Sequence, residues 1–168
     1  MAAKQKWNVL IKEEEIKNGH NVSFLFPAHD LVAVQSRPFM VNYDIYCGSL
    51  PTSWALTLIY KHKGEPYEFS LSFTLTRTDR RNDFLNVYAI ALLSCLDANN
   101  RLVRFTQDIC EKRMAVGDVV QGYVEESSSL VSVLKVSLLV QFCHDTKDFD
   151  PDASLSSHVW KEVRCLKM

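Results

Sequence analysis

Two stretches of alternating apolar and polar residues, separated by a short charged connection, constrain this chain more than any other feature. In the first stretch the apolar residues are Trp54, Leu56, Leu58 and Tyr60, and in the second they are Phe69, Leu71, Phe73 and Leu75. An apolar residue at every second position places these side chains on one face of each strand. Gly64 and Pro66 in the connection favour a turn, so we predict a β-hairpin with a loop of about 4 to 6 residues.

The same period of two recurs on both sides of this hairpin. Further strands are predicted at Trp7–Ile11, Val22–Phe26, Leu31–Gln35, Phe39–Tyr46, Leu102–Thr106, from Val119 into a loop ending at Ser129, and at Val133–Phe142. Val87–Ser94 is apolar on both faces, which is typical of a central strand buried between two layers, although a short buried helix fits as well. Asp97–Asn100 predicts a turn, with Leu102–Thr106 as the partner strand of a second hairpin.

Two segments carry a helical pattern. Asp108–Val116 has an acidic residue at a possible N-cap and is predicted to be a two-turn helix or an irregular crossover. In residues 153–168 the apolar side chains fall at helical spacing and indicate an amphipathic helix that docks on a partner or on the domain itself. The residues of this stripe are Leu155, Val159, Val163 and Leu166.

These elements predict an all-β fold, an antiparallel β-sandwich of about seven to eight strands with a short C-terminal amphipathic helix. We expect residues 1–144 to form the sandwich, residues 145–152 to be a linker and residues 153–168 to be the helical tail. A chain of 168 residues is long enough to fold around one core without metals or disulfides.

Charge and cysteine usage narrow the classes of function. The 19 basic and 20 acidic residues leave a formal net charge of -1, which disfavours a nucleic-acid-binding domain. No apolar run approaches the roughly 20 residues of a membrane helix, and no secretory signal opens the chain. The five cysteines include no Cys-x-x-Cys pair, which favours reduced thiols in the cytoplasm or nucleus over a disulfide framework.

The sequence contains no recognisable catalytic motif. Cys143 and His144 are adjacent, but neighbours on a strand point to opposite faces and cannot form a nucleophile and base pair. Zinc ligands normally occur in closely spaced pairs, and only Cys143, His144 and Asp145 lie close together, which is a weak zinc signal. We therefore expect a non-enzymatic protein without a metal or cofactor.

The order of these strands resembles a known family. Trp54–Tyr60, Gly64, Phe69–Leu75, Val87–Leu93 and the turn at Asp97–Asn99 are similar to the middle of a MATH (TRAF-like) domain, as found in speckle-type POZ and TRAF adaptor proteins. Trp7 resembles the tryptophan of the family's first strand, and Val133–Phe142 resembles its last strand. The resemblance covers roughly residues 5 to 144, without an attached BTB domain or coiled coil.

The resemblance implies an adaptor that binds a short linear peptide of a partner protein by strand addition or groove docking, for ubiquitin-ligase recruitment or signalling. Many MATH domains carry a Trp-Gly-Phe groove segment, where this chain has Gln121-Gly122-Tyr123 and lacks the tryptophan. Gly122 and Tyr123 are the positions implied for peptide binding, and strand matching adds Phe69 and Tyr88. For each aromatic residue, a place in the core or on the sheet surface is an equally good interpretation.

Periodicity alone also fits a structural or viral sandwich of the jelly-roll type, which self-assembles or contacts a host protein. The adaptor hypothesis predicts a monomer or weak homo-oligomer with a protein or peptide partner. A large closed assembly would favour the alternative.

Overall fold

Ten strands and one short helix make up the described part of the chain, which in this computed structural model comprises residues 7–34, 38–64, 68–79, 86–103, 106–141 and 159–165. Of residues 7, 8, 31, 33, 34 and 159–165 only the backbone is described. The elements are β1 (Trp7–Ile16), β2 (Gly19–Pro27), α1 (Ala28–Val34), β3 (Pro38–Ile45), β4 (Thr52–His62), β5 (Glu68–Arg77), β6 (Val87–Leu96), β7 (Gln107–Met114), β8 (Val119–Ser127), β9 (Val133–Gln141) and β10 (Val159–Cys165).

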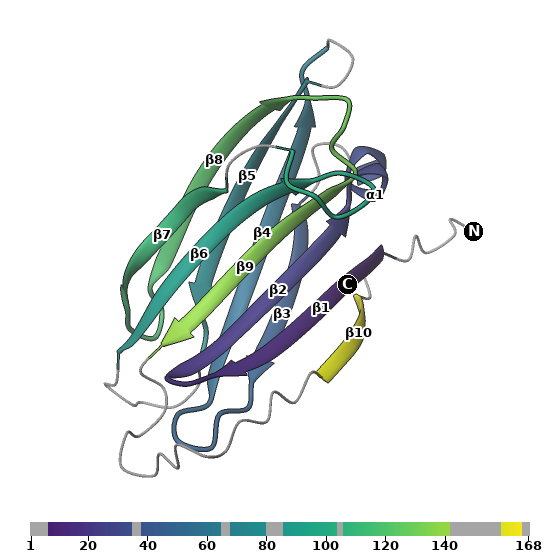
Figure 1. The fold of residues 1–168 in the computed structure, drawn as a ribbon. Coiled ribbons are helices and arrows are strands. Elements are labelled where there is room, and N and C mark those ends of the chain that lie inside the picture. Colours follow the sequence, from purple (N-terminus) through teal and green to yellow (C-terminus); the bar gives the residue numbers. More distant parts are fainter. Residues whose placement is uncertain are drawn as a thin grey trace, which may run out of the picture.

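The strands form two sheets packed face to face, which confirms the predicted all-β sandwich (Figure 1). One sheet has six strands in the order β10-β1-β2-β9-β6-β7, and the other has four in the order β3-β4-β5-β8. All neighbouring strands run antiparallel. The hydrogen-bonded ladders place β7 at an edge of the first sheet, and β3 and β8 at the two edges of the second.

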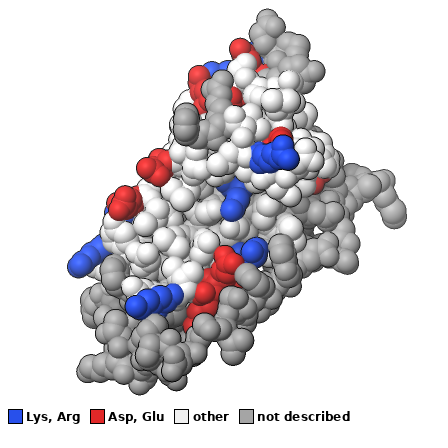
Figure 2. Space-filling model, viewed as in Figure 1, with Lys and Arg blue, Asp and Glu red and all other residues white. Residues whose placement is uncertain are grey.

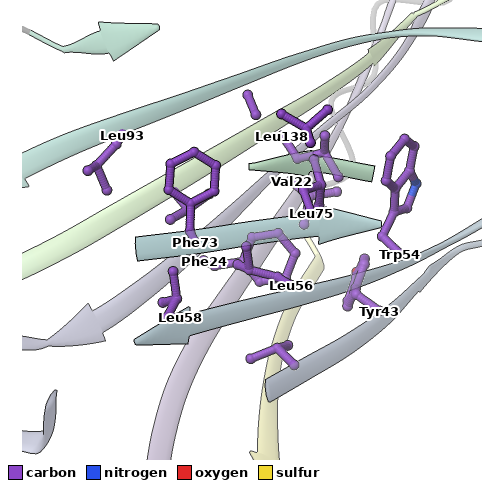
Figure 3. Close-up of a cluster of buried hydrophobic side chains, with 14 of the residues drawn as sticks. Val22, Phe24, Tyr43, Trp54, Leu56, Leu58, Phe73, Leu75, Leu93 and Leu138 are labelled. Carbon is purple, nitrogen blue, oxygen red and sulfur yellow. The ribbon is translucent and has the colours of Figure 1, made fainter. Parts of the chain in front are cut away.

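The predicted central hairpin is present as β4 and β5. Its register pairs Leu56 with Leu75 and Leu58 with Phe73, so the two apolar rows share the inner face. Trp54 is only 1% exposed, and its indole Nε1 donates to Thr52 Oγ1 at 2.9 Å. Figure 3 shows these side chains meeting the inward row of the six-stranded sheet, including Phe24 and Leu138. The alternation in the sequence therefore identifies the core.

Two local predictions, one before the central hairpin and one after it, are wrong. Leu31–Gln35 was predicted as a strand, but α1 is helical over its described residues, because a run this short cannot distinguish the two periods and Asp30 suits a first helical turn. Asp108–Val116 was predicted as a helix or crossover, but β7 is a strand paired with β6. Its buried residues Cys110 and Met114 lie four apart, a spacing that fits a helix and a strand equally.

The predicted second hairpin also has a different partner strand. β6 pairs with β7, whereas Leu102 makes only an isolated bridge to Leu96, and residues 104 and 105 lie outside the described part. The turn itself is confirmed, since Asp97 Oδ1 accepts hydrogen bonds from the backbone N–H groups of Asn99 and Arg101.

Part of the C-terminal tail also departs from its prediction. Residues 159–165 form β10, which pairs with β1 from Trp7↔Cys165 to Glu13↔Val159, so the helix predicted there is wrong. Val159 and Val163 are four apart and fit both periods, and β-branched residues favour strands. Leu155, Leu166 and the linker 145–152 lie outside the described residues.

Candidate functional site

The four residues implied for peptide binding occupy different places in the sandwich. Phe69 lies in the core, where it is 5% exposed and stacks on Tyr60 with ring centroids 5.3 Å apart. Tyr88 is half-buried on β6 of the six-stranded sheet, and its hydroxyl donates to Glu111 Oε1 at 2.5 Å. Gly122 and Tyr123 lie on β8 of the four-stranded sheet. The structure therefore brings only Gly122 and Tyr123 together, and Tyr88 cannot line the same groove.

Tyr123 is the exposed member of this pair. Its side chain is 58% exposed and faces outward, while Val120 and Val124 of the same strand face the core. The Tyr123 hydroxyl donates to Glu125 Oε1 at 2.5 Å. This bond joins two outward-facing side chains of β8 and leaves more than half of Tyr123 exposed.

The outward-facing residues of β8 form a row that ends at Glu125 and Ser127. A short ion-pair network lies at this end of the row. Lys63 donates to the same Glu125 oxygen from the β4–β5 connection. Hydrogen bonds from Lys63 and then from Tyr123 lower the pKa of Glu125, and the bond to Glu125 raises the pKa of Lys63. Each of the two side chains thus stabilises the charged form of the other, so this end of the site offers little unbalanced charge.

Gly122 has a packing reason to be glycine. A Cβ added there would lie 1.9 Å from Cζ of Phe73, whose ring is 2% exposed. The Phe73 ring on β5 therefore fills the space that a side chain at position 122 would need. Tyr123 follows directly on β8, which the backbone ladder joins to β5.

Small hydroxyl side chains adjoin the Tyr123 row on the outer face. In register, Val119 lies opposite Thr76, Gln121 opposite Thr74 and Tyr123 opposite Ser72. Residues directly opposite on antiparallel strands share a face and adjoin. From Val119 to Tyr123 the outer row of β8 thus carries no charge and lies beside a row of small serine and threonine side chains on β5.

The edge strands differ in how they discourage pairing with another chain. Proteins protect sheet edges with charged side chains, lysine and proline. β7 carries four charged residues among its eight, and β3 begins with Pro38. The first six residues of β8, Val119 to Val124, contain no charge and no proline. Within the described residues β8 pairs only with β5, so its other side presents backbone donors and acceptors.

Sequence reasoning missed two buried polar groups. Between the sheets, Tyr43 donates to Glu13 Oε2, and His20 Nδ1 lies 3.1 Å from Glu13 Oε1. Burial, followed by the bond to Glu13, raises the pKa of Tyr43. The sequence offered little indication of this cluster, because its residues lie on three different strands and come together only in the folded sandwich.

The second group is a buried ion pair beside a surface cavity. Arg77 has a fully buried side chain. It donates from Nε and Nη2 to Asp79 Oδ2 at 2.8 and 2.6 Å, and from Nη1 to the Met114 carbonyl at 2.8 Å. Asp79 Oδ1 also accepts from the Ser53 N–H at 2.5 Å. Asp79 lines a cavity of about 780 Å³ together with Asp44, Ile45, Tyr46, Cys47, Gly48, Pro51, Thr52, Ser53 and Thr78. Since Arg77 neutralises Asp79, we interpret this cluster as a structural clamp.

Across the described ranges, no three His, Cys, Asp or Glu side chains converge on a point where a metal ion could bind. No helix in that part of the chain has the length and apolar character needed to cross a membrane.

Comparisons of the chain with protein families, with curated proteins and with solved structures found no match. The function must therefore be inferred from the chain's own residues, and above all from β8 and its exposed tyrosine.

Proposed function

We propose that this chain is a non-enzymatic protein-interaction module that binds a short, extended segment of a partner protein along β8. One observation carries the proposal. β8 is an edge strand whose first six residues lack charge and proline. It presents Tyr123, 58% exposed, beside a row of small hydroxyl side chains on β5. The resemblance of Gln121-Gly122-Tyr123 to the groove segment of MATH adaptors supports the same position.

The chemistry of strand addition fits this edge. An added strand gains affinity from backbone hydrogen bonds and selectivity from alternate side chains that meet the host surface. On β8 those alternate contacts are Val119, Gln121 and Tyr123, which share the outer face. We therefore expect a segment with uncharged side chains at the positions that face this row.

Peptide display on the full chain, followed by Tyr123→Ala, tests the proposal. An aromatic anchor contributes about 2 kcal/mol or more to an interface, so the variant should bind an enriched peptide at least about 10-fold more weakly. Tyr88→Ala is the matched control, because Tyr88 also bonds to a glutamate but lies on the other sheet. It should bind like the wild type.

Peptides methylated at single backbone nitrogens test strand addition itself. If the peptide pairs with β8, methylation at every second position removes a hydrogen bond to β8 and weakens binding, while the intervening positions tolerate it. Failure to enrich any linear motif, or unchanged binding by Tyr123→Ala, would show that β8 is not the binding site.

A further inference from the structure

Lys112 is a charged residue on the core-facing row of an edge strand. The ladder between β6 and β7 pairs Lys112 with the buried Ala89, so the two residues share the inner face of their sheet. The neighbours of Lys112 on the same row, Cys110 and Met114, are 9% and 0% exposed. Lys112 itself is exposed. Its side chain therefore starts on the inner face of the sheet and ends in solvent.

The side chain of Lys112 leaves the core on the side of the sandwich that β7 and β8 form together, which we call the β7–β8 flank. The inner row of β7 faces the four-stranded sheet, whose edge strand on this side is β8 (Figure 1). A long lysine side chain packs its stem on apolar surface and keeps its ammonium group in water. Burial raises the pKa of the Cys110 thiol, and the charge of Lys112 opposes this shift, which agrees with an ammonium group on the inner side of β7.

Lys112 differs in position from the other charged residues of β7. The other three face outward with Leu92, Ile90 and Tyr88 of β6, and they are Asp108, Glu111 and Arg113. Figure 2 shows charged residues of both signs along the left side of the molecule, where β7 lies. None of the ion pairs among the described residues includes Lys112. The inner row of β7 thus carries one positive charge and no negative one.

The turn between β7 and β8 sets the level of Lys112 along β8. Asp118 closes this turn, because its Oδ2 accepts a hydrogen bond from the N–H of Ala115 at 2.9 Å. Lys112 lies two residues before the end of β7, and Gln121 lies two residues after the start of β8. Each is therefore about 7 Å along its strand from the turn. Lys112 is level with the first half of β8, the stretch that contains no charge.

A strand added to β8 would place half of its side chains on the β7–β8 flank. Side chains of a strand alternate between the two faces, so one set would lie beside Tyr123 and the other in line with Val120 and Val124. The second set would lie next to Lys112. An apolar side chain there would take water from the ammonium group without replacing its hydrogen bonds, which is unfavourable. A carboxylate would instead form a charge-assisted hydrogen bond with it.

We propose that the partner segment bound at β8 carries an aspartate or glutamate at one inward-facing position, and that Lys112 selects this residue. The inference rests on the proposed strand addition at β8 and extends it. Outward positions of the segment meet Val119, Gln121 and Tyr123 and are uncharged, whereas an inward position is chosen by its negative charge. The partner is therefore an extended segment in which one acidic side chain stands between uncharged neighbours.

Peptide display on the wild type and on Lys112→Glu tests this selection. The wild type should enrich Asp or Glu at one fixed position with uncharged residues on both sides, and Lys112→Glu should enrich Lys or Arg there. A wild-type peptide should bind Lys112→Glu about 10-fold more weakly, because an attraction is replaced by a repulsion of similar size. Replacing its acidic residue by lysine should restore binding to the variant.

Arg113→Glu is the matched control. It makes the same change in net charge at the adjacent residue, but Arg113 lies on the outer face of β7. This variant should bind the acidic peptide like the wild type. Lys112→Gln removes the charge with little change in size, so it should weaken binding by a smaller factor and make binding less dependent on salt.

Three outcomes separate this inference from the β8 site itself. Enriched peptides without an acidic residue, or equal binding by Lys112→Glu and Arg113→Glu, would overturn the selection by Lys112. If Tyr123→Ala weakens binding and Lys112→Glu does not, the β8 site stands and the selection is wrong. If neither variant weakens binding, strand addition at β8 is wrong, and the selection by Lys112 is wrong with it.

Discussion

The two outer faces of the sandwich belong to sheets of the same antiparallel type, yet they differ in chemistry. On the outer face of the four-stranded sheet, β4 and β5 carry mainly alanine, serine and threonine, including Ser72 and Thr74, although Ile59 of β4 and the 61% exposed Met40 of β3 also face outward. The outer face of the six-stranded sheet places Ile90, Leu92 and Leu139 at the equivalent outward positions. Both faces alternate with the same buried core, so the need for a core does not explain the difference.

Antiparallel sheets commonly have one face on the core and one solvated, with polar residues outside. The serine and threonine side chains of β5 follow this rule, and the distinctive feature of their sheet is the edge strand β8 with Tyr123. The six-stranded sheet departs from the rule at Ile90, Leu92 and Leu139. We therefore propose that the partner-binding site lies at the β8 edge of the four-stranded sheet.

The largest effect is expected at the end of β5, where the chain leaves the four-stranded sheet for the six-stranded one. Arg77→Met should lower the free energy of unfolding by about 3–5 kcal/mol, because it leaves the Asp79 carboxylate buried without its partner. The Met114 carbonyl at the end of β7 also loses its donor. Urea denaturation followed by tryptophan fluorescence measures the change.

A double variant checks the cause of that loss. Arg77→Met combined with Asp79→Leu removes both charges and should recover a large part of the stability, since replacing a whole buried pair by apolar residues is often nearly neutral. If the double variant is less stable than Arg77→Met, the buried charge is not the cause of the loss.

Gly122→Ala tests the packing of β8 on β5. The added methyl group meets the buried ring of Phe73, and overpacking of this kind costs about 1–3 kcal/mol. We expect a lower midpoint in urea, together with weaker peptide binding. Val119→Ala, an outward substitution on the same strand, is the control for stability. Equal stability of Gly122→Ala and wild type would contradict the packing account.

Tyr43→Phe tests the polar cluster between the two sheets, with the smallest expected effect. The pKa of Tyr43 is raised above its ordinary value of 10.0, so above pH 10 the unfolded chain loses this proton before the folded one does. Stability is therefore present below pH 10 and falls as the pH rises, by at most about 1.4 kcal/mol per pH unit for this group. The stability profile of Tyr43→Phe should be flatter above pH 10, and a parallel profile would contradict the assignment.

The alternation of apolar and polar residues was enough to predict that this fold is a sandwich of two sheets. The rows beginning at Trp54 and Phe69 identify the central hairpin and its inner face, and the Asp97 turn was found from its own hydrogen-bonding chemistry. The predictions failed where apolar residues lie four apart, as Cys110 and Met114 do, because this spacing belongs to both periods. Long-range pairing with β6 decided between them.

The candidate site was less predictable than the fold. Tyr123 could be placed from its local segment, but its exposure depends on β8 being an edge strand, which is a property of strand order. Phe69 and Tyr88 matched family positions by strand counting, yet one is in the core and the other is on the opposite sheet. Arg77 looked like an ordinary charge at the end of a strand, and only the close approach of Asp79 and Met114 explains its burial.

Amide hydrogen exchange with and without an enriched peptide tests the central claim, that β8 is the edge that receives a partner strand. The peptide should slow exchange at alternate amides between Val119 and Ser127, those that point away from β5, and should leave the amides of β6 and β9 unchanged. Slower exchange along β3 or β7 with no change in β8 would contradict the claim.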